Sequence, residues 1–159
     1  MKITIGVSEM QLGNRSDDIL VTHALGSCIG LAIHDPVAGV GGILHYMLPL
    51  SKIDPEKAAS NPYMFGDTGI PAFFMEAYKL GAKKENICVV MAGGADIIDK
   101  CNFFDIGNRN IFIARKIFWK NGIMITAEET GGNHPRTMFL DIGSGKSWIT
   151  SGGKRIDLN

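Results

Sequence analysis

Apolar and polar residues alternate along several short stretches of the chain, with the period of two that is typical of half-buried β-strands. The alternation predicts strands at residues 3–7, 19–22, 28–34, 40–47, 123–128, 137–142 and 147–150. Residues 86–92 instead form an almost continuous apolar run, which predicts a strand covered on both faces. About eight strands are therefore predicted, and they cluster toward the two ends of the chain.

Two segments repeat their apolar residues with the helical period. Residues 70–80 form the first predicted helix and residues 109–120 the second, with Asn108 as the N-cap of the second. Aromatic residues of the second helix share one face and its edge, and we expect Phe112, Phe118 and Trp119 to pack in the core. Between the strands and the first helix, residues 51–66 are polar and contain two prolines, which indicates an irregular surface loop.

This order of elements places the chain in the α/β class, of the α+β type. Because strands do not alternate strictly with helices, a mixed β-sheet with helices packed against it fits better than a series of βαβ units. The 159 residues contain no repeat or linker, so we expect one domain over residues 1–159.

Composition narrows the range of partners. Sixteen basic residues balance sixteen acidic ones, and this removes the broad positive field that nucleic-acid binding usually needs. No apolar run approaches the roughly 18 residues of a membrane-spanning helix, and residues 1–7 are too short and too alternating for a secretory leader. We therefore expect a cytoplasmic protein without membrane insertion, in which the three cysteines are reduced thiols.

The strands predicted at residues 28–34 and 40–47 are joined by a turn-forming segment, Asp35-Pro36-Val37-Ala38-Gly39. A two-residue loop would place Cys28 directly opposite His45, whereas a four-residue loop would pair Cys28 with Met47 and leave His45 on the diagonal. Both registers keep Cys28 and His45 on the same face of the hairpin, because side chains alternate with period two. A thiol and an imidazole are thus brought together by local structure alone.

Such a pair suits nucleophilic catalysis. A neighbouring imidazolium stabilises a thiolate, and the cysteine can then attack an amide or ester carbonyl while His45 returns the proton to the leaving group. The Thr22 hydroxyl could accept the second N–H of His45 and so orient the ring. Leu25, Gly26 and Ser27 form a tight turn, and its backbone N–H groups, with that of Cys28, could face an oxyanion. Gly26 and Ser27 also leave room for substrate.

Other side chains give weaker signals. A cysteine–histidine pair can also be simple packing, since free cysteine is often buried. Cys88 lies in an apolar run and is expected to be an inert core thiol, and Cys101 has no distinctive neighbours. His23, His34 and His134 share no ligand spacing with one another or with the cysteines, so we expect no metal site. The chain has no glycine-rich phosphate motif in the right context, and we expect no cofactor.

Several segments, in order, resemble the chemoreceptor glutamine deamidase (CheD) family. They are residues 25–28 (LGSC), 34–38 (HDPVA) and 45–49 (HYMLP), followed by 92–95, 106–110 and 130–133, with Arg136 a little beyond. The resemblance implies a layered, mixed β-sheet sandwich with two main helices, similar to deamidating bacterial toxins. It also implies a catalytic cysteine at Cys28, a histidine at His45 and a threonine at Thr22.

The implied activity is the deamidation of glutamine side chains on the cytoplasmic domains of chemoreceptors. The resemblance further implies a CheC-type phosphatase as a possible partner. One alternative is a regulatory binding module for such a phosphatase with little turnover of its own. A second alternative is a general cysteine peptidase or esterase, because a thioester would also form from a methyl ester.

Overall fold

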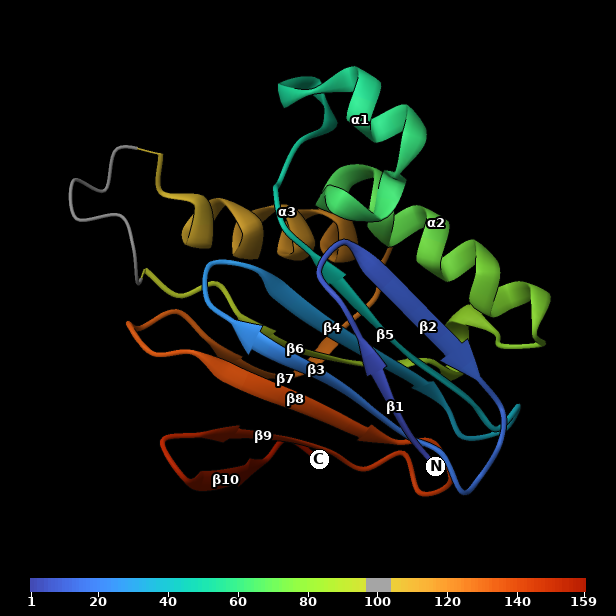
Figure 1. The fold of residues 1–159 in the computed structure, drawn as a ribbon. Helices are drawn as coiled ribbons and strands as arrows, with labels where there is room; N and C mark the ends of the chain where they lie inside the picture. Colours follow the sequence, from blue (N-terminus) through green and yellow to red (C-terminus); the bar gives the residue numbers. More distant parts are fainter. Residues whose placement is uncertain (97–103) are drawn as a thin grey trace.

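The computed structural model describes residues 1–96 and 104–159, which form two stacked β-sheets with helices on one side (Figure 1). Sheet A has the strand order β1 (Lys2–Ile5), β3 (Ile19–Leu25), β8 (Arg136–Asp141), β9 (Ser147–Ser151) and β10 (Lys154–Asp157). Sheet B has the order β2 (Glu9–Gly13), β5 (Val40–Tyr46), β4 (Ile29–Asp35), β6 (Cys88–Gly93) and β7 (Ile125–Thr130). The predicted mixed-sheet sandwich is confirmed.

Both sheets combine parallel and antiparallel pairs. Strand β1 runs parallel to β3 and β6 parallel to β7, while the other neighbours are antiparallel. The β4–β5 hairpin pairs Asp35 with Val40 and Gly30 with His45. Its loop therefore has the longer of the two lengths that the sequence allowed, residues 36–39. The Asp35 carboxylate accepts the backbone N–H groups of Val37 and Ala38 and so fixes this loop.

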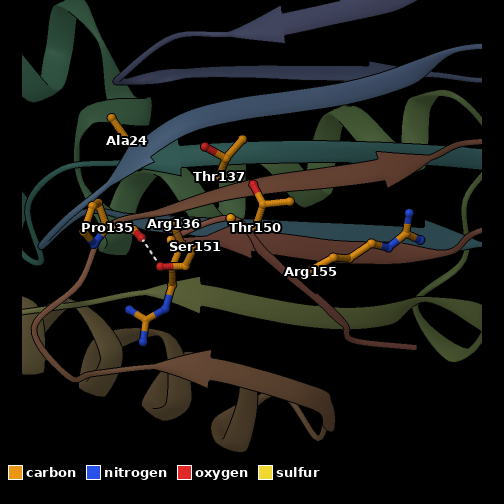
Figure 2. Close-up of a pocket in the computed structure, with 9 residues that line it drawn as sticks. Ala24, Pro135, Arg136, Thr137, Thr150, Ser151 and Arg155 are labelled. Carbon is orange, nitrogen blue, oxygen red and sulfur yellow. Dashed lines mark hydrogen bonds between the residues drawn. The ribbon is translucent and has the colours of Figure 1, made fainter.

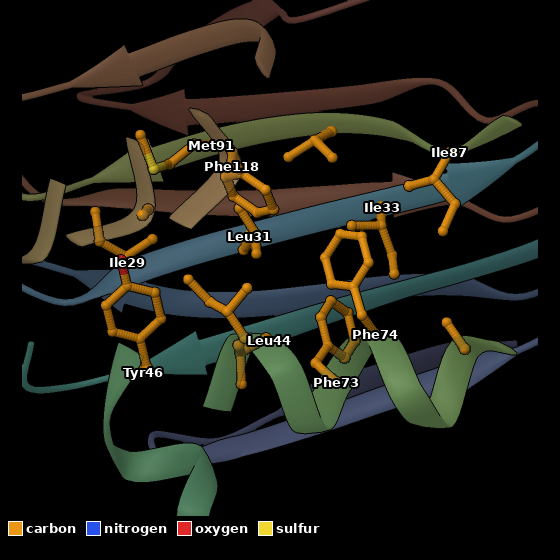
Figure 3. Packing of buried hydrophobic residues seen from close by; sticks show 14 of the residues in the cluster. Ile29, Leu31, Ile33, Leu44, Tyr46, Phe73, Phe74, Ile87, Met91 and Phe118 are labelled. Atoms are coloured by element: carbon orange, nitrogen blue, oxygen red, sulfur yellow. The ribbon is translucent and has the colours of Figure 1, made fainter. Parts of the chain in front are cut away.

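The helices α2 (Gly66–Lys79) and α3 (Ile106–Lys120) cover the outer face of sheet B. Alternate residues of β4 face opposite layers: Ile29, Leu31 and Ile33 pack against the helices, whereas Ala32 packs between the two sheets. Aromatic rings fill the layer under the helices, where Phe74 and Phe118 have ring centroids 5.6 Å apart (Figure 3). Strand β4 thus contributes to both cores.

Some elements differ from the predictions. The expected loop at residues 51–66 contains a short helix, α1 (Pro55–Ser60), flanked by two 3-10 turns, and α2 begins at its last residue. The edge strands β2 and β10 were not predicted. Helix α3 begins three residues earlier than expected, so its N-cap is Asp105 and not Asn108. No helix of the described residues is long and apolar enough to cross a membrane.

Two predictions of burial are wrong. Phe112 and Trp119 are 65% and 81% exposed on α3, and only Phe118 of the three predicted core aromatics is buried. Cys88 is also exposed, because it is the first residue of β6 and precedes the part of the strand that both layers cover. Cys101 lies outside the described residues.

Candidate active site

Thr22, Cys28 and His45 come from three neighbouring elements at one end of the sandwich. Thr22 lies in β3 of sheet A, His45 in β5 of sheet B, and Cys28 in the turn that carries the chain from β3 to β4. The half-buried Cys28 packs against the core between the two sheets. Thr22 and His45 are fully buried and meet across the sandwich, with 2.7 Å between Thr22 Oγ1 and His45 Nδ1.

The register places Cys28 diagonally to His45. His45 pairs with Gly30, and Cys28 precedes Gly30 by two residues, so the two functional side chains share one face of sheet B. Position 30 is crowded, because a Cβ there would lie 2.8 Å from Leu25 Cδ1 and would force that side chain to shift. Gly93 supports the same turn from β6: it has a φ of 106°, and a Cβ there would lie 2.2 Å from the Cys28 carbonyl oxygen.

The Thr22 hydroxyl determines which nitrogen of His45 carries the proton. Thr22 Oγ1 donates its single hydrogen to the Ile5 carbonyl oxygen, at 2.8 Å. The contact with His45 must therefore run the other way, with Nδ1–H donating to Thr22 Oγ1. In the neutral ring, Nε2 is then unprotonated. This atom is buried and has no hydrogen-bond partner among the described residues, which leaves its lone pair able to take a proton.

Burial keeps both reacting groups neutral. Desolvation lowers the pKa of His45 to about 4, against a smaller opposing effect of the Glu9 carboxylate. Burial also raises the pKa of the Cys28 thiol, and the backbone N–H of the same residue offsets this in part. Burial thus favours a thiol at Cys28 and a neutral imidazole at His45 near neutral pH, and not the thiolate and imidazolium that the sequence suggested.

The turn of residues 26–28 is anchored through its carbonyl groups. Gly26 O accepts Ala95 N–H at 2.8 Å, Cys28 O accepts Gly94 N–H at 2.9 Å, and Ser27 O accepts the side-chain amide of Asn110 at 2.8 Å. In a trans peptide the N–H points opposite to the preceding C=O. The N–H of Ser27 therefore points away from Ala95, and the N–H of Cys28 points away from Asn110.

One part of the predicted oxyanion site is wrong. The N–H of Gly26 donates to the Ala24 carbonyl oxygen at 3.0 Å, so it is already satisfied within the turn. Ala24 adopts the left-handed conformation, with a φ of 58°, at the bulge where the pairing of β3 with β8 shifts. Of the other predicted donors, Leu25 belongs to β3 and pairs with Arg136 of β8, whereas Ser27 and Cys28 lie in the turn itself.

Reasoning from the sequence missed Asn110 as a structural link to the site. Its side-chain N–H groups donate to Ser27 O at 2.8 Å and to Met47 O at 2.9 Å. Its backbone carbonyl oxygen accepts the Tyr46 hydroxyl at 2.5 Å. Asn110 thereby joins the turn of residues 26–28, which carries the proposed nucleophile and is called the nucleophile turn below, to the end of the strand that carries His45. The available signal was an amide on the apolar side of a helix, where asparagine is a poor helix former.

A buried arginine supports the same region. Arg136, 2% exposed, donates to Gly93 O at 3.2 Å and to Gly131 O at 2.7 Å, and its guanidinium lies 3.5 Å from a Glu129 carboxylate oxygen. The guanidinium thus ties the loop after β7 to the end of β6, which carries the glycine that faces Cys28. Arg136 therefore affects the site indirectly, by holding the backbone of Gly93 and Gly131 in place.

A groove of about 500 Å³ opens next to this region, on the side of sheet A (Figure 2). Its lining residues are Ala24, Pro135, Arg136, Thr137, Thr150, Ser151, Gly152, Gly153 and Arg155. The Ser151 hydroxyl donates to the Pro135 carbonyl oxygen at 2.7 Å, which closes one wall. Through Ala24 the groove adjoins the turn that leads to Cys28. No cluster of three metal-ligating side chains occurs among the residues that the structure describes.

Known proteins resemble this chain over most of its length. Residues 47–151 match the family model described as CheD chemotactic sensory transduction. A protein of Syntrophus aciditrophicus named probable chemoreceptor glutamine deamidase CheD 1 is 52% identical over 151 residues, which cover 95% of this chain and 94% of that protein. Similarly named proteins of Solibacter usitatus and Anaeromyxobacter dehalogenans are 47% and 39% identical over 99% and 94% of this chain, and 93% and 94% of their own length.

Proposed function

This chain belongs to the CheD family, and from that membership we propose that it deamidates glutamine side chains of chemoreceptors, with Cys28 as nucleophile. The observation that carries the proposal is the single hydroxyl proton of Thr22. Because this proton is given to Ile5 O, His45 presents an unprotonated Nε2 on the face that it shares with the thiol.

The reaction begins from the neutral pair. Cys28 Sγ attacks the glutamine Cδ while its proton passes to His45 Nε2, and the new imidazolium is stabilised by Thr22 Oγ1 at Nδ1. The negative charge on the amide oxygen is met by the N–H groups of Ser27 and Cys28, which point out of the anchored turn. Gly26 and Ser27 leave room for the incoming side chain.

The second half reverses the proton transfer. The imidazolium donates its proton to the nitrogen, the C–N bond breaks and ammonia leaves, which gives a thioester on Cys28. His45 then takes a proton from water, whose oxygen attacks the thioester carbon. The C–S bond breaks, the thiol regains the proton, and the product is glutamate. No step needs a metal or cofactor.

The proposal is tested by incubating the protein with a purified chemoreceptor cytoplasmic fragment. We expect ammonia release together with the mass increase that replacing an amide by a carboxyl produces, mapped to individual glutamines. Cys28→Ala and His45→Ala should abolish both signals. Cys88→Ala is the matched control, because it removes an exposed thiol elsewhere, and it should leave the rate unchanged. Equal conversion by Cys28→Ala would contradict the proposal.

Thr22 is tested by two substitutions of similar size. Thr22→Ser keeps the hydroxyl that accepts His45 Nδ1–H and should retain most activity. Thr22→Val removes it and leaves the ring without its orienting partner, so kcat should fall about 10- to 100-fold, less than on loss of His45 itself. Equal activity of the two variants would show that the hydroxyl has no part in the reaction.

Two other activities are distinguished by the same experiment. Peptide-bond cleavage would appear as chain scission, and methylester hydrolysis as loss of the methyl group from a methylated fragment. A CheC-type phosphatase is the second proposed partner. If the protein were a regulatory module without turnover, its wild-type and Cys28→Ala forms would bind the phosphatase equally well, and neither would release ammonia. Because receptor cytoplasmic domains are the proposed substrates, we place the activity in the cytoplasm.

A further inference from the structure

The outward side of α3 carries a stripe of alternating basic and aromatic residues. Arg109, Phe112, Lys116 and Trp119 are spaced by three, four and three residues, so they lie along one side of the helix. All four are exposed. The opposite side, with Ile111, Ala114 and Phe118, is buried, and Figure 3 shows Phe118 among the core side chains. We name these four residues the α3 stripe, and at 1.5 Å per residue it is about 15 Å long.

The charge of this helix is one-sided. Between residues 106 and 120 the chain has four basic residues and no acidic one, although the molecule as a whole has sixteen of each sign. Arg115 is paired with Glu128 at 2.7 Å, whereas Arg109, Lys116 and Lys120 form no ion pair with any described residue. A positive field with two exposed aromatic rings is therefore presented to solvent, and exposed aromatic residues and arginine are enriched at protein interfaces.

The stripe begins beside the active site. Asn110, next to Arg109 in the first turns of α3, donates to the carbonyl oxygen of Ser27 in the nucleophile turn, at 2.8 Å. Gly107 packs against the end of β6, where a Cβ would lie 2.6 Å from Gly94 O. Figure 1 shows the turn between β3 and β4 next to the first half of α3. The first turn of α3, where the stripe begins, is therefore in contact with the turn that carries Cys28.

We propose that the α3 stripe binds an acidic segment, with apolar residues among its carboxylates, that flanks the target glutamine in the substrate. Carboxylates of this segment would meet Arg109 and Lys116, and its apolar side chains would cover Phe112 and Trp119. The stripe is then a specificity surface: it selects among glutamines by the charge of their neighbours and contributes to binding while the chemistry stays at Cys28. This inference rests on the proposed deamidase function.

An acidic polypeptide fits better than a nucleic acid. The stripe is one helix face of about 15 Å, and the molecule has no net charge, so the long positive track that follows a phosphate backbone is missing from the described surface of this helix. The stripe also adjoins a turn built to receive a protein side chain. Nucleic-acid binding is treated as a competing outcome of the test.

The test uses two synthetic peptides of equal length, each with one central glutamine and identical leucines. The flanks contain glutamate in one peptide and lysine in the other. Wild type should release ammonia from the glutamate peptide with a KM about tenfold lower and similar kcat, and this preference should shrink with added salt. In Arg109→Glu/Lys116→Glu the preference should reverse. Phe112→Ser/Trp119→Ser should raise KM for both peptides.

Lys146→Glu/Lys154→Glu is the matched control, since it makes the same change of charge at exposed positions of the other sheet, before β9 and at the start of β10, and its KM values should equal those of wild type. Unchanged preference in the α3 double variant would overturn the inference. Competition of single-stranded DNA with the glutamate peptide at equal concentration would overturn it as well.

Binding is measured separately by fluorescence anisotropy of both labelled peptides on Cys28→Ala protein. This readout needs no turnover. If neither peptide releases ammonia but the charge preference appears in binding, the deamidase proposal fails and the stripe stands. If ammonia is released but neither binding nor KM depends on the charge of the peptide, the proposed role of the α3 stripe fails and the deamidase proposal stands.

Discussion

At the scale of single residues, the chemistry of the site depends on where a few protons are placed. The Thr22 hydroxyl has one hydrogen and gives it to a backbone carbonyl, so His45 has to donate from Nδ1. The sequence predicted that Thr22 would accept from His45, and this contact is present. It could not predict the neutral state of the pair, because that state comes from burial between two sheets and not from the spacing of Cys28 and His45.

The buried neutral His45 makes stability depend on pH. Its folded pKa of about 4 lies below the ordinary 6.5, so between these values the unfolded chain binds more protons than the folded one. Stability should therefore fall as pH drops through this window. Between pH 7 and pH 5 the contribution of His45 to the free energy of unfolding should fall by about 2 kcal/mol. Urea unfolding of wild type and His45→Gln at both pH values measures this difference. The free energy of unfolding of the variant should fall less between pH 7 and pH 5 than that of wild type, by the same amount. Equal losses in the two proteins would contradict a depressed pKa.

Cys88 should react faster than Cys28 at neutral pH, which is the reverse of what the sequence indicated. The sequence indicated an inert core thiol at Cys88 and an activated thiol at Cys28, but Cys88 is exposed, whereas Cys28 is half-buried and its pKa is raised. In a Cys101→Ala background, iodoacetamide at pH 7 should modify Cys88 first, and Cys28 should gain on it as pH rises. Peptide mapping after short exposure gives both rates. Faster modification of Cys28 at pH 7 would instead indicate a thiolate–imidazolium pair.

At the scale of elements, the strands with one buried face were predictable and the edges were not. Strand β10 has no buried residue and one apolar side chain, so it lacks the alternation that marks a core-facing strand. Strand β2 does alternate, but only Met10 and Leu12 mark its inner face and both are only partly buried. On α3, Phe112 and Trp119 repeat with the same period as the core residues. A helical period identifies which residues share a face, but it does not determine which of two apolar faces meets the sheet.

Asn110 shows how one element sets the geometry of another. Asn110→Ala would remove two hydrogen bonds and leave the carbonyl oxygens of Ser27 and Met47 without them, which should lower the free energy of unfolding by about 1–3 kcal/mol. Because the nucleophile turn would lose its anchor to α3, kcat should fall more than KM rises. Asn108→Ala changes an exposed position on the same helix and is the control. It should leave the free energy of unfolding and kcat nearly unchanged. A variant that loses stability but keeps kcat would limit Asn110 to a structural role.

At the scale of the whole molecule, the site exists because the chain crosses from one sheet to the other. Local sequence could predict the β4–β5 hairpin, and with it the shared face of Cys28 and His45. It could not supply Ile5, Asn110 or Arg136, which reach the site from β1, α3 and β8 only after the sandwich is assembled. Such contacts depend on the packing of layers, so no spacing along the chain encodes them directly.

The same architecture predicts how the protein unfolds. Strand β4 packs Leu31 against the helices and Ala32 between the sheets, so neither core can be lost without exposing the other. We therefore propose that residues 1–159 behave as a single cooperative domain. In Trp119→Phe the remaining tryptophan, Trp148, stacks on Phe139 with ring centroids 5.2 Å apart and reports on sheet A, while far-ultraviolet circular dichroism reports mainly on α2 and α3. Urea midpoints from the two signals should coincide. Loss of the helical signal at lower urea than the Trp148 signal would mean that the helical layer unfolds on its own, and that the anchor of the nucleophile turn on α3 is weaker than its hydrogen bonds indicate.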